Sequence, residues 1–359
     1  MSRLNSPTIT QRIKNFSAST LLLITTYLFY IVFPDFQKFT SKTVDIFSHH
    51  FVIGDALQVF CGIYCILLLI YYFSEKDPGV SKSIYCLQGT KKIFQNPVRV
   101  YREGLLKEEK LGILATLLKA LFAPMMLASL LIFLSGLITN GVYLFTEPDL
   151  LQKGFLSIFN SYGFWFVFQL ILFIDVCLFS MGYLVEIPRL KNTIRSVDPT
   201  LMGWAVALAC YPPFNGLTSK ILGWEPAHFP QFENPTIHIV ANLTVLLLMV
   251  GYTSTAIALN FKASNLTHRG IISHGPYRFV RHPAYICKNV SWWIASMPAL
   301  SVVFEASLWS AFLVFASGVG WTLIYLMRAL TEEDHLRKVD GEYDEYCKKV
   351  PYRFIPGVI

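Results

Sequence analysis

The stretch HGPYRFVRHPAY, residues 274–285, stands between two long apolar runs in a chain that is 54% hydrophobic. Four of its side chains are cationic or can become so: His274, Arg278, Arg281 and His282. Two tyrosines with polar tips, Tyr277 and Tyr285, accompany them, and two prolines restrict the backbone. Such a segment is either a basic loop at a membrane surface or a binding site for a charged cofactor.

The composition of the whole chain indicates an integral membrane protein. Only 15% of the 359 residues are charged, and the mean hydropathy is +0.48. A soluble domain has about 25% charged residues, so too few remain here to solvate a surface of this size. The formal net charge of +7 is spread over several segments rather than clustered on one face. A nucleic-acid partner is therefore not expected.

Apolar runs long enough to cross a bilayer, which takes roughly 20 residues, recur along the chain. We expect eight membrane spans, at 17–33, 51–73, 121–145, 164–185, 201–222, 236–260, 285–300 and 304–327. The predicted fold is therefore all-α, a polytopic helical membrane protein. Pro212-Pro213 lies within the fifth run, which we expect to be kinked or re-entrant. The last two runs predict a helical hairpin that turns between Pro298 and Val303.

Lysine and arginine determine the predicted orientation. The basic segments are 74–112, 186–200, 262–283 and the tail after residue 328. Eight spans place all of them on one side of the membrane together with both termini, in agreement with the positive-inside rule. The prediction is a multi-pass membrane protein with both termini, the 274–285 loop and the tail on the cytoplasmic side.

The tail RALTEEDHLRKVDGEYDEYCKKVPYRFIP, residues 328–356, is the second concentration of polar groups. Because the predicted hairpin starts at the 274–285 loop and returns to this tail, the two segments are expected to meet. Together they offer cations, the carboxylates of Glu332 and Glu333, and aromatic faces. Such groups suit S-adenosylmethionine, which presents a carboxylate, an ammonium, a sulfonium and a purine. NADPH would also use arginines and aromatic rings.

The run from Gly275 to Tyr285 resembles the GPYRxxRHPxY signature of the membrane-embedded isoprenylcysteine carboxyl methyltransferase and phospholipid methyltransferase superfamily. The tail adds the Glu332-Glu333 pair and a VPYRFIP segment in the order that this superfamily shows. The resemblance covers roughly residues 236–359, which we expect to form a methyltransferase-like core. Residues 1–235 are predicted to be N-terminal membrane helices of unassigned family.

The resemblance implies a site for S-adenosylmethionine enclosed by the loop, the hairpin and the tail. Transferred to this chain, its cofactor-binding residues are Tyr277, Arg281, His282, Pro283, Tyr285, Glu332 and Glu333. Arg281 is expected to bind the methionine carboxylate, the two glutamates its amino group or ribose, and Pro283 to shape the turn into the seventh span. Where the superfamily often has a glycine two residues after the motif tyrosine, this chain has Cys287, followed by Lys288.

The predicted function is methyl transfer from S-adenosylmethionine to a lipid or lipidated acceptor, such as an isoprenylcysteine carboxylate. Because the reaction is an in-line displacement, alignment and exclusion of water are the main tasks. Arg328 and Arg353 are the candidates to orient an anionic acceptor. The partners expected are the lipid bilayer and a lipophilic acceptor.

The alternative is an NADPH-dependent sterol or isoprenoid reductase on the same fold, because residues 345–356 also match the EYCxxVPYRxxP-like ending of those enzymes. The intact GPYR and the doubled glutamate, which suits an ammonium and repels phosphates, favour methyl transfer. A transporter is a third class, disfavoured because the polar groups gather at one end.

Other polar residues within apolar runs leave several roles open. Asp175 is either functional or packed against a polar neighbour. His238 and Asn242, four residues apart, either line a substrate tunnel or form hydrogen bonds between helices, and the second role is favoured. Lys288 is expected to reach the membrane surface, and Trp292-Trp293 either line a pocket or pack in the interior. The seven cysteines form no CxxC and no Cys/His cluster, so no metal site is predicted.

Overall fold

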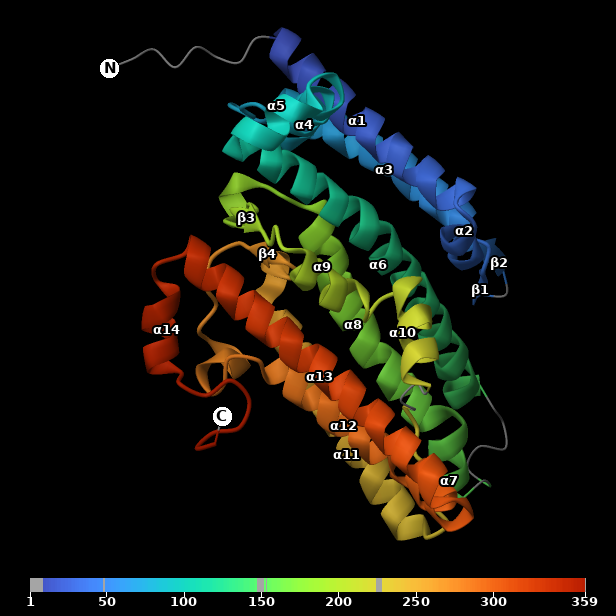
Figure 1. Cartoon of the computed structure of the whole chain (residues 1–359). Coiled ribbons are helices and arrows are strands. Elements are labelled where there is room, and N and C mark those ends of the chain that lie inside the picture. Colours follow the sequence, from blue (N-terminus) through green and yellow to red (C-terminus); the bar gives the residue numbers. More distant parts are fainter. Residues whose placement is uncertain (1–8, 48, 147–151, 153, 224–227, 359) are drawn as a thin grey trace. The chain divides into compact units, whose positions relative to one another are not determined.

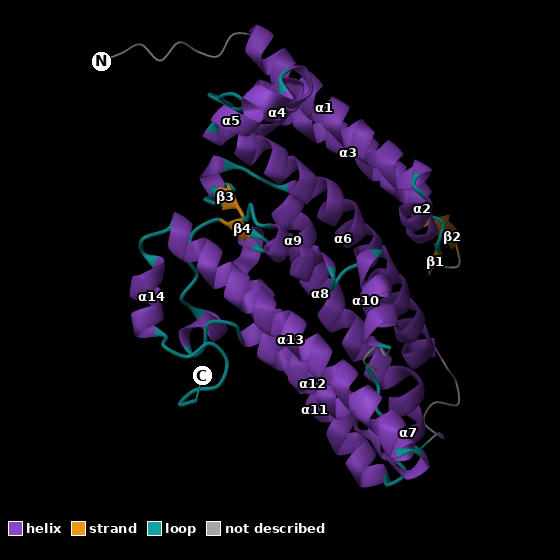
Figure 2. Ribbon diagram, in the orientation of Figure 1, coloured by secondary structure: helices purple, strands orange, loops and turns teal. Residues whose placement is uncertain are grey.

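The computed structural model describes residues 9–47, 49–146, 152, 154–223 and 228–358. Helices hold 77% of the chain, which confirms the predicted all-α class. The strands of the described residues form two short pairs (Figure 2). They are β1 (Thr43–Ile46) with β2 (His49–Val52), and β3 (Ser196–Val197) with β4 (Thr267–His268).

The chain divides into two compact units, the first made of residues 1–44 and 50–128, the second of residues 45–49 and 129–359. Helix α6 (Lys107–Thr146) contributes to both (Figure 1). The other helices of the first unit are α1 (Ile9–Val32), α2 (Pro34–Thr40), α3 (Ile53–Ser74), α4 (Lys82–Gln95) and α5 (Pro97–Glu103).

Helix α1 packs against α3 and α4 in the first unit. Buried Asn15 holds the connection between α3 and α4, because its Nδ2 donates to Gly79 O at 2.8 Å and its Oδ1 accepts from Ser81 N at 2.9 Å. Gly112 lets α6 approach α4, since a Cβ there would stand 2.7 Å from the backbone N of Cys86.

The second unit contains the loop and the tail that the sequence singles out. Its α-helices are α7 (Phe155–Ile158), α8 (Phe164–Leu184), α9 (Leu201–Leu208), α10 (Phe214–Leu222), α11 (Pro235–Leu259), α12 (Pro283–Ala306), α13 (Leu308–Val339) and α14 (Tyr343–Lys349). Short π or 3₁₀ turns are η2 (Phe159–Gly163), η3 (Pro188–Leu190), η4 (Asn260–Lys262) and η5 (Gly275–Arg278). Helix α11 packs on both α8 and α12, and α12 packs on α13.

Helix α11 shows the polarity expected of a helix in lipid, with apolar residues outside and polar residues inside. Val240 and Leu247 are exposed, whereas His238 and Asn242 are buried. His238 Nε2 lies 2.8 Å from Asn160 Oδ1 on η2, so the predicted hydrogen bonding between helices is confirmed for His238.

Among the described residues, six helices are long and apolar enough to cross a membrane, which indicates a multi-pass membrane protein. They are Ile9–Val32, Ile53–Ser74, Lys107–Thr146, Phe155–Leu184, Pro235–Lys262 and Leu308–Val339. The predicted count of eight is not confirmed. The fifth predicted span, 201–222, forms α9 and α10, of 8 and 9 residues, and neither has the length to cross alone. Helix α12 has 24 residues but is not one of the six.

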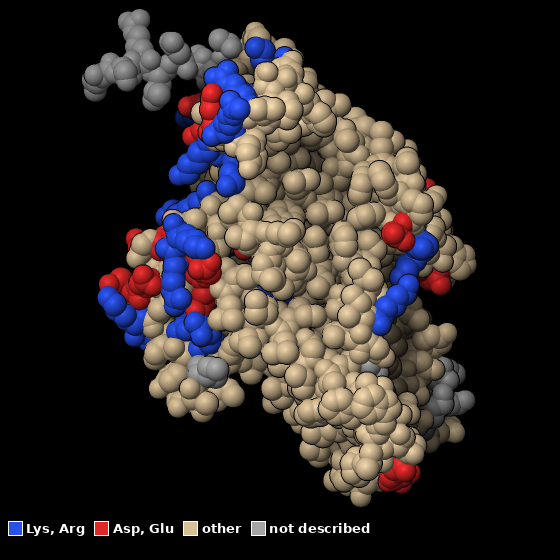
Figure 3. Space-filling view, viewed as in Figure 1, with Lys and Arg blue, Asp and Glu red and all other residues tan. Residues whose placement is uncertain are grey.

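The prediction of orientation depends on that count, so it stays a prediction. Residues 1–8, 147–151, 153, 224–227 and 359 lie outside the described residues, and they include both chain ends and parts of the two loops expected opposite the basic segments. In the second unit, charged side chains gather around β3 and α14, whereas the surface of α13 farther along is largely uncharged (Figure 3).

The α12–α13 hairpin forms as predicted, but its predicted turn was wrong. Pro298 lies inside α12, and the chain turns at Ser307. A proline removes one helical hydrogen bond without ending a helix whose neighbours keep it packed. Ser307 is the N-cap of the next helix, because its side chain accepts a hydrogen bond from Ser310 N. Helix α13 then continues unbroken into the polar tail and carries Arg328, Glu332 and Glu333.

We predict that Gly182→Ala destabilises the second unit, because a Cβ at Gly182 would overlap the carbonyl oxygen of buried Ala263. The expected loss is about 1–3 kcal/mol, measured as a lower thermal midpoint in detergent. Gly216→Ala on α10 is the control, since a Cβ there meets nothing within 4 Å. Equal thermal midpoints for both variants would contradict the close approach of α8 to the backbone of Ala263.

Candidate functional site

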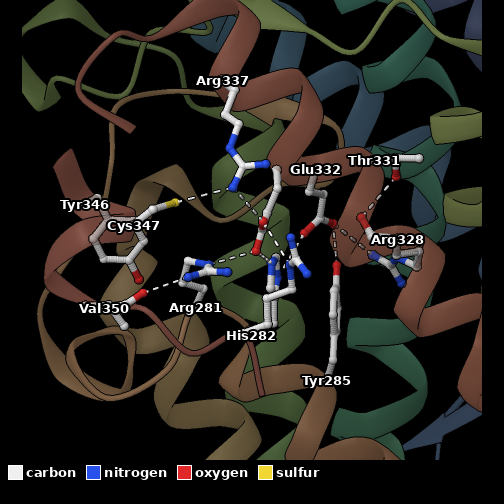
Figure 4. Close-up of polar contacts among 12 residues, drawn as sticks. Arg281, His282, Tyr285, Arg328, Thr331, Glu332, Arg337, Tyr346, Cys347 and Val350 are labelled. Atoms are coloured by element: carbon white, nitrogen blue, oxygen red, sulfur yellow. Dashed lines mark hydrogen bonds and ion pairs between the residues drawn. The ribbon is translucent and has the colours of Figure 1, made fainter. Parts of the chain in front are cut away.

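Buried Glu333 joins the 274–285 loop to the tail. Its side chain is 1% exposed, and its Oε1 accepts hydrogen bonds from Arg281 Nε at 2.8 Å and His282 Nε2 at 3.1 Å. The other oxygen, Oε2, accepts from Arg353 Nε at 3.0 Å. Figure 4 shows the loop residues and the α13 carboxylates facing one another. We call Glu333, Arg281, His282 and Arg353 the loop–tail clasp.

Main-chain bonds reinforce the clasp. Arg281 Nη1 donates to the carbonyls of Val350 at 2.8 Å and Pro351 at 2.6 Å. The backbone N of Arg281 donates to Tyr352 O at 3.0 Å. The loop is therefore hydrogen-bonded to the tail through both its main chain and the side chain of Arg281. The Nε and Nη1 donors of Arg281 bind protein acceptors.

A cavity of about 210 Å³ lies beside the clasp, within the second unit. Its wall combines charges of both signs with tyrosine rings. The cationic or titratable basic residues are Lys262, His268, Arg269, Arg281, His282, Lys288, Arg328 and His335, and the carboxylates are Asp175, Asp198 and Glu332. The tyrosines are Tyr211, Tyr252, Tyr277, Tyr285, Tyr325, Tyr343 and Tyr346.

Two arginines of this wall have donors without an acceptor in the part of the chain that the structure describes. Arg328 is 5% exposed, and its Nη2 donates to Asn265 Oδ1 at 2.9 Å, but its Nε has no acceptor among the described residues. Arg269 Nη1 donates to Asn192 O at 2.8 Å, whereas its Nε and Nη2 have no acceptor there either. Buried donors without partners are costly, so both arginines are suited to an anionic or carbonyl group of a ligand.

Glu332 differs from Glu333 in its exposure and its partners. Its side chain is 31% exposed, and Oε1 accepts a short hydrogen bond from Tyr285 OH. The Tyr285 ring stacks on His282, with the ring centroids 5.5 Å apart. Glu332 therefore presents a fixed carboxylate to the cavity, whereas Glu333 is enclosed by its cations.

Burial determines the protonation state of several groups that line the cavity. It raises the pKa of the Tyr277, Tyr343 and Tyr346 phenols, so these residues stay neutral and act through hydrogen bonds. Burial also lowers the pKa of His268, although the Asp340 carboxylate at 2.7 Å opposes this shift. Burial likewise lowers the pKa of Arg269, against the attraction of Glu186.

The structure brings most of the predicted site residues to one cavity. Those that line it are Tyr277, Arg281, His282, Tyr285, Arg328 and Glu332. The others lie beside it: Pro283 is the first residue of α12, and Glu333 and Arg353 belong to the clasp. Their ligand-binding and acceptor-orienting roles stay predictions, and the contacts of Arg281, Glu333 and Arg353 are those of a structural junction.

Lys288 lines the cavity, and its reach to the membrane surface stays a prediction. Its Nζ lies 5.5 Å from the ring centroid of Tyr252, 5.3 Å from that of Trp292 and 5.8 Å from that of Tyr325. Its spacing of three residues from Tyr285 places both on one helix face, a signal that could have indicated this position.

Other residues of the wall carry no local signal in the sequence. Asn265 accepts a hydrogen bond from Arg328 and also donates through Nδ2 to Tyr183 OH at 2.9 Å, contacts that only the fold creates.

Trp293 packs inside the hairpin, where its Nε1 donates to Thr322 Oγ1 at 3.1 Å. Among the described residues, no group of three or more His, Cys, Asp or Glu side chains is arranged to hold a metal ion.

A protein-family model described as "Protein of unknown function (DUF1295)" matches residues 226–350. This family is linked to membrane proteins of the steroid-reductase and methyltransferase-like kind. The match covers the loop, the α12–α13 hairpin and most of the tail, where the sequence resemblance also lies. No curated protein and no solved structure matches the chain.

We predict that Arg281→Met destabilises the protein by about 3–5 kcal/mol, because it removes a partner from a buried charge. The readouts are the thermal midpoint in detergent and the rate of proteolysis within residues 343–356, which should rise as the tail detaches. Arg337→Met is the matched control: its side chain is 43% exposed and contacts the same Glu333 at 3.4 Å, so its loss should cost about 1 kcal/mol or less. Similar effects of the two substitutions would exclude the clasp.

Proposed function

We propose that the chain is an integral-membrane methyltransferase that uses S-adenosylmethionine and acts on a lipid or lipidated acceptor. The observation that carries the proposal is that one cavity holds both the carboxylate of Glu332 and buried arginine donors that have no acceptor among the described residues. The methionine end of the cofactor holds a carboxylate and an ammonium on the same carbon, so a site with both charges fits it.

The residues divide the binding of this cofactor among them. Arg328 and Arg269 have free donors for the carboxylate, and Glu332 is the acceptor for the ammonium. Arg281, the first candidate for the carboxylate from the sequence, has its Nε and Nη1 donors engaged with Glu333 and the tail carbonyls. Tyrosine rings around the cavity suit a sulfonium.

The bound cofactor supplies an electrophilic methyl group. What this chain contributes is alignment and exclusion of water. The clasp joins the loop to the tail beside the cavity, and Arg328 is held by Asn265 and by the rings of Tyr285 and Tyr325, whose centroids lie 5.1 and 5.3 Å from its guanidinium carbon. We also propose that both termini and the loop–tail end of the second unit are cytoplasmic, because lysine and arginine are concentrated in the segments 74–112, 186–200, 262–283 and the tail after residue 328.

An NADPH-dependent reductase is the second candidate. The link of the matched family to steroid reductases and the cations of the cavity favour it. Against it, the carboxylates of Asp175, Asp198 and Glu332 line the same cavity and would repel phosphates. Arg281 and Arg353, which would otherwise serve phosphates, are paired with Glu333.

Calorimetric titration of the detergent-purified chain with S-adenosylmethionine and with NADPH tests the proposal. We expect S-adenosylmethionine to bind and Glu332→Gln to weaken it about tenfold or more, since a hydrogen bond to a charged group contributes about 1.5–3 kcal/mol. Glu345→Gln removes the same charge from an exposed tail position paired with Lys348 and should leave affinity unchanged. Binding of NADPH alone would replace the proposal with the reductase.

A further inference from the structure

Asp175 is a buried acid with an unused oxygen. It lies on α8 in the apolar run FIDVCLF, is 5% exposed and lines the cavity. Its Oδ2 accepts a hydrogen bond from Tyr252 OH at 3.2 Å, whereas its Oδ1 has no partner among the described residues. An ionisable residue within a membrane span is costly, and one with an unsatisfied oxygen that faces a cavity indicates a ligand that donates a hydrogen bond.

Lys288 needs a hydrogen-bond acceptor, whereas Asp175 needs a donor. Its ammonium lies among the rings of Tyr252, Trp292 and Tyr325 and lines the same cavity. Within the described part of the chain it makes no hydrogen bond and no ion pair, although the charges of Asp175 and Lys288 attract each other. The ammonium is thus a donor that lacks an acceptor.

One ligand group satisfies both residues. A carboxylate would meet Lys288 but would face Asp175 as a like charge, and an ammonium would meet Asp175 but would face Lys288 and Arg328. A hydroxyl donates one hydrogen bond and accepts two. We propose that Asp175, Tyr252 and Lys288 form a subsite that binds the hydroxyl of an alcohol or phenol.

The position of the subsite indicates a lipophilic carrier for this hydroxyl. Asp175 and Tyr252 belong to α8 and α11, which lie within two of the helices apolar enough to cross a membrane. A hydroxyl reaches that depth on an apolar body. Resting on the proposed function, the subsite makes an alcohol or phenol lipid the methyl acceptor, rather than the carboxylate suggested by the sequence resemblance. The hydroxyl oxygen would form the new C–O bond as the sulfur–methyl bond of the cofactor breaks, and the hydroxyl proton would pass to Oδ1 of Asp175, which has no partner among the described residues.

Three amphiphiles that share one dodecylphenyl body separate the possible head groups: para-dodecylphenol, para-dodecylbenzoate and para-dodecylbenzylamine. Binding to the detergent-purified full chain is followed by tryptophan fluorescence, because Trp292 lies 5.3 Å from Lys288 Nζ and reports locally. Trp292→Phe should remove the signal. We expect the phenol to bind about tenfold more tightly than the other two, the factor that one hydrogen bond to a charged group provides.

Asp175→Leu and Lys288→Met should each abolish the preference for the phenol, and exposed Lys220→Met should not. Lys288→Met places an apolar chain of similar length among the same rings, so it tests the subsite even where Asp175→Leu fails to fold. Equal affinities in the wild type, or a preference that survives Lys288→Met, would overturn the subsite. S-adenosylmethionine titration of the same proteins separates the two proposals: a phenol preference without cofactor binding supports the subsite and contradicts only the methyltransferase.

Discussion

The second unit depends on the burial of one carboxylate. Glu333 is 1% exposed, and a charge taken out of water at that depth requires cations to pair with it. The 274–285 loop supplies Arg281 and His282, and the tail supplies Arg353. The loop precedes the α12–α13 hairpin and the tail follows it. Their hydrogen bonds to Glu333 therefore hold the two segments together beside the cavity.

The charges around this cavity fall into two kinds. Those of the clasp are satisfied by each other and by tail carbonyls, so they serve the fold. Those of the cavity are incompletely satisfied: Arg328 and Arg269 keep free donors, and Asp175 keeps a free acceptor, among the described residues. Unsatisfied buried groups are expensive, and a structure that keeps them beside a cavity is suited to a ligand with matching polar groups.

Much of this arrangement could be predicted from the sequence, because apolar runs determine helices and the hairpin determines which segments meet. The errors have physical causes. Pro298 did not end α12, because a packed helix tolerates a proline. The cavity that Lys288 lines is formed by segments far apart in the sequence, although the spacing of Lys288 from Tyr285 indicates a shared helix face. Spacing could not tell that Arg281 would pair with Glu333, or that Asn265 would hold Arg328, 63 residues away.

Hydrogen exchange of the full chain in detergent tests most directly whether the loop and the tail enclose a cofactor site. Addition of S-adenosylmethionine should slow exchange in two separate segments at once, residues 264–285 and residues 328–352. The first unit should exchange as before. No protection, or protection confined to residues outside these two segments, would contradict an enclosed cofactor site.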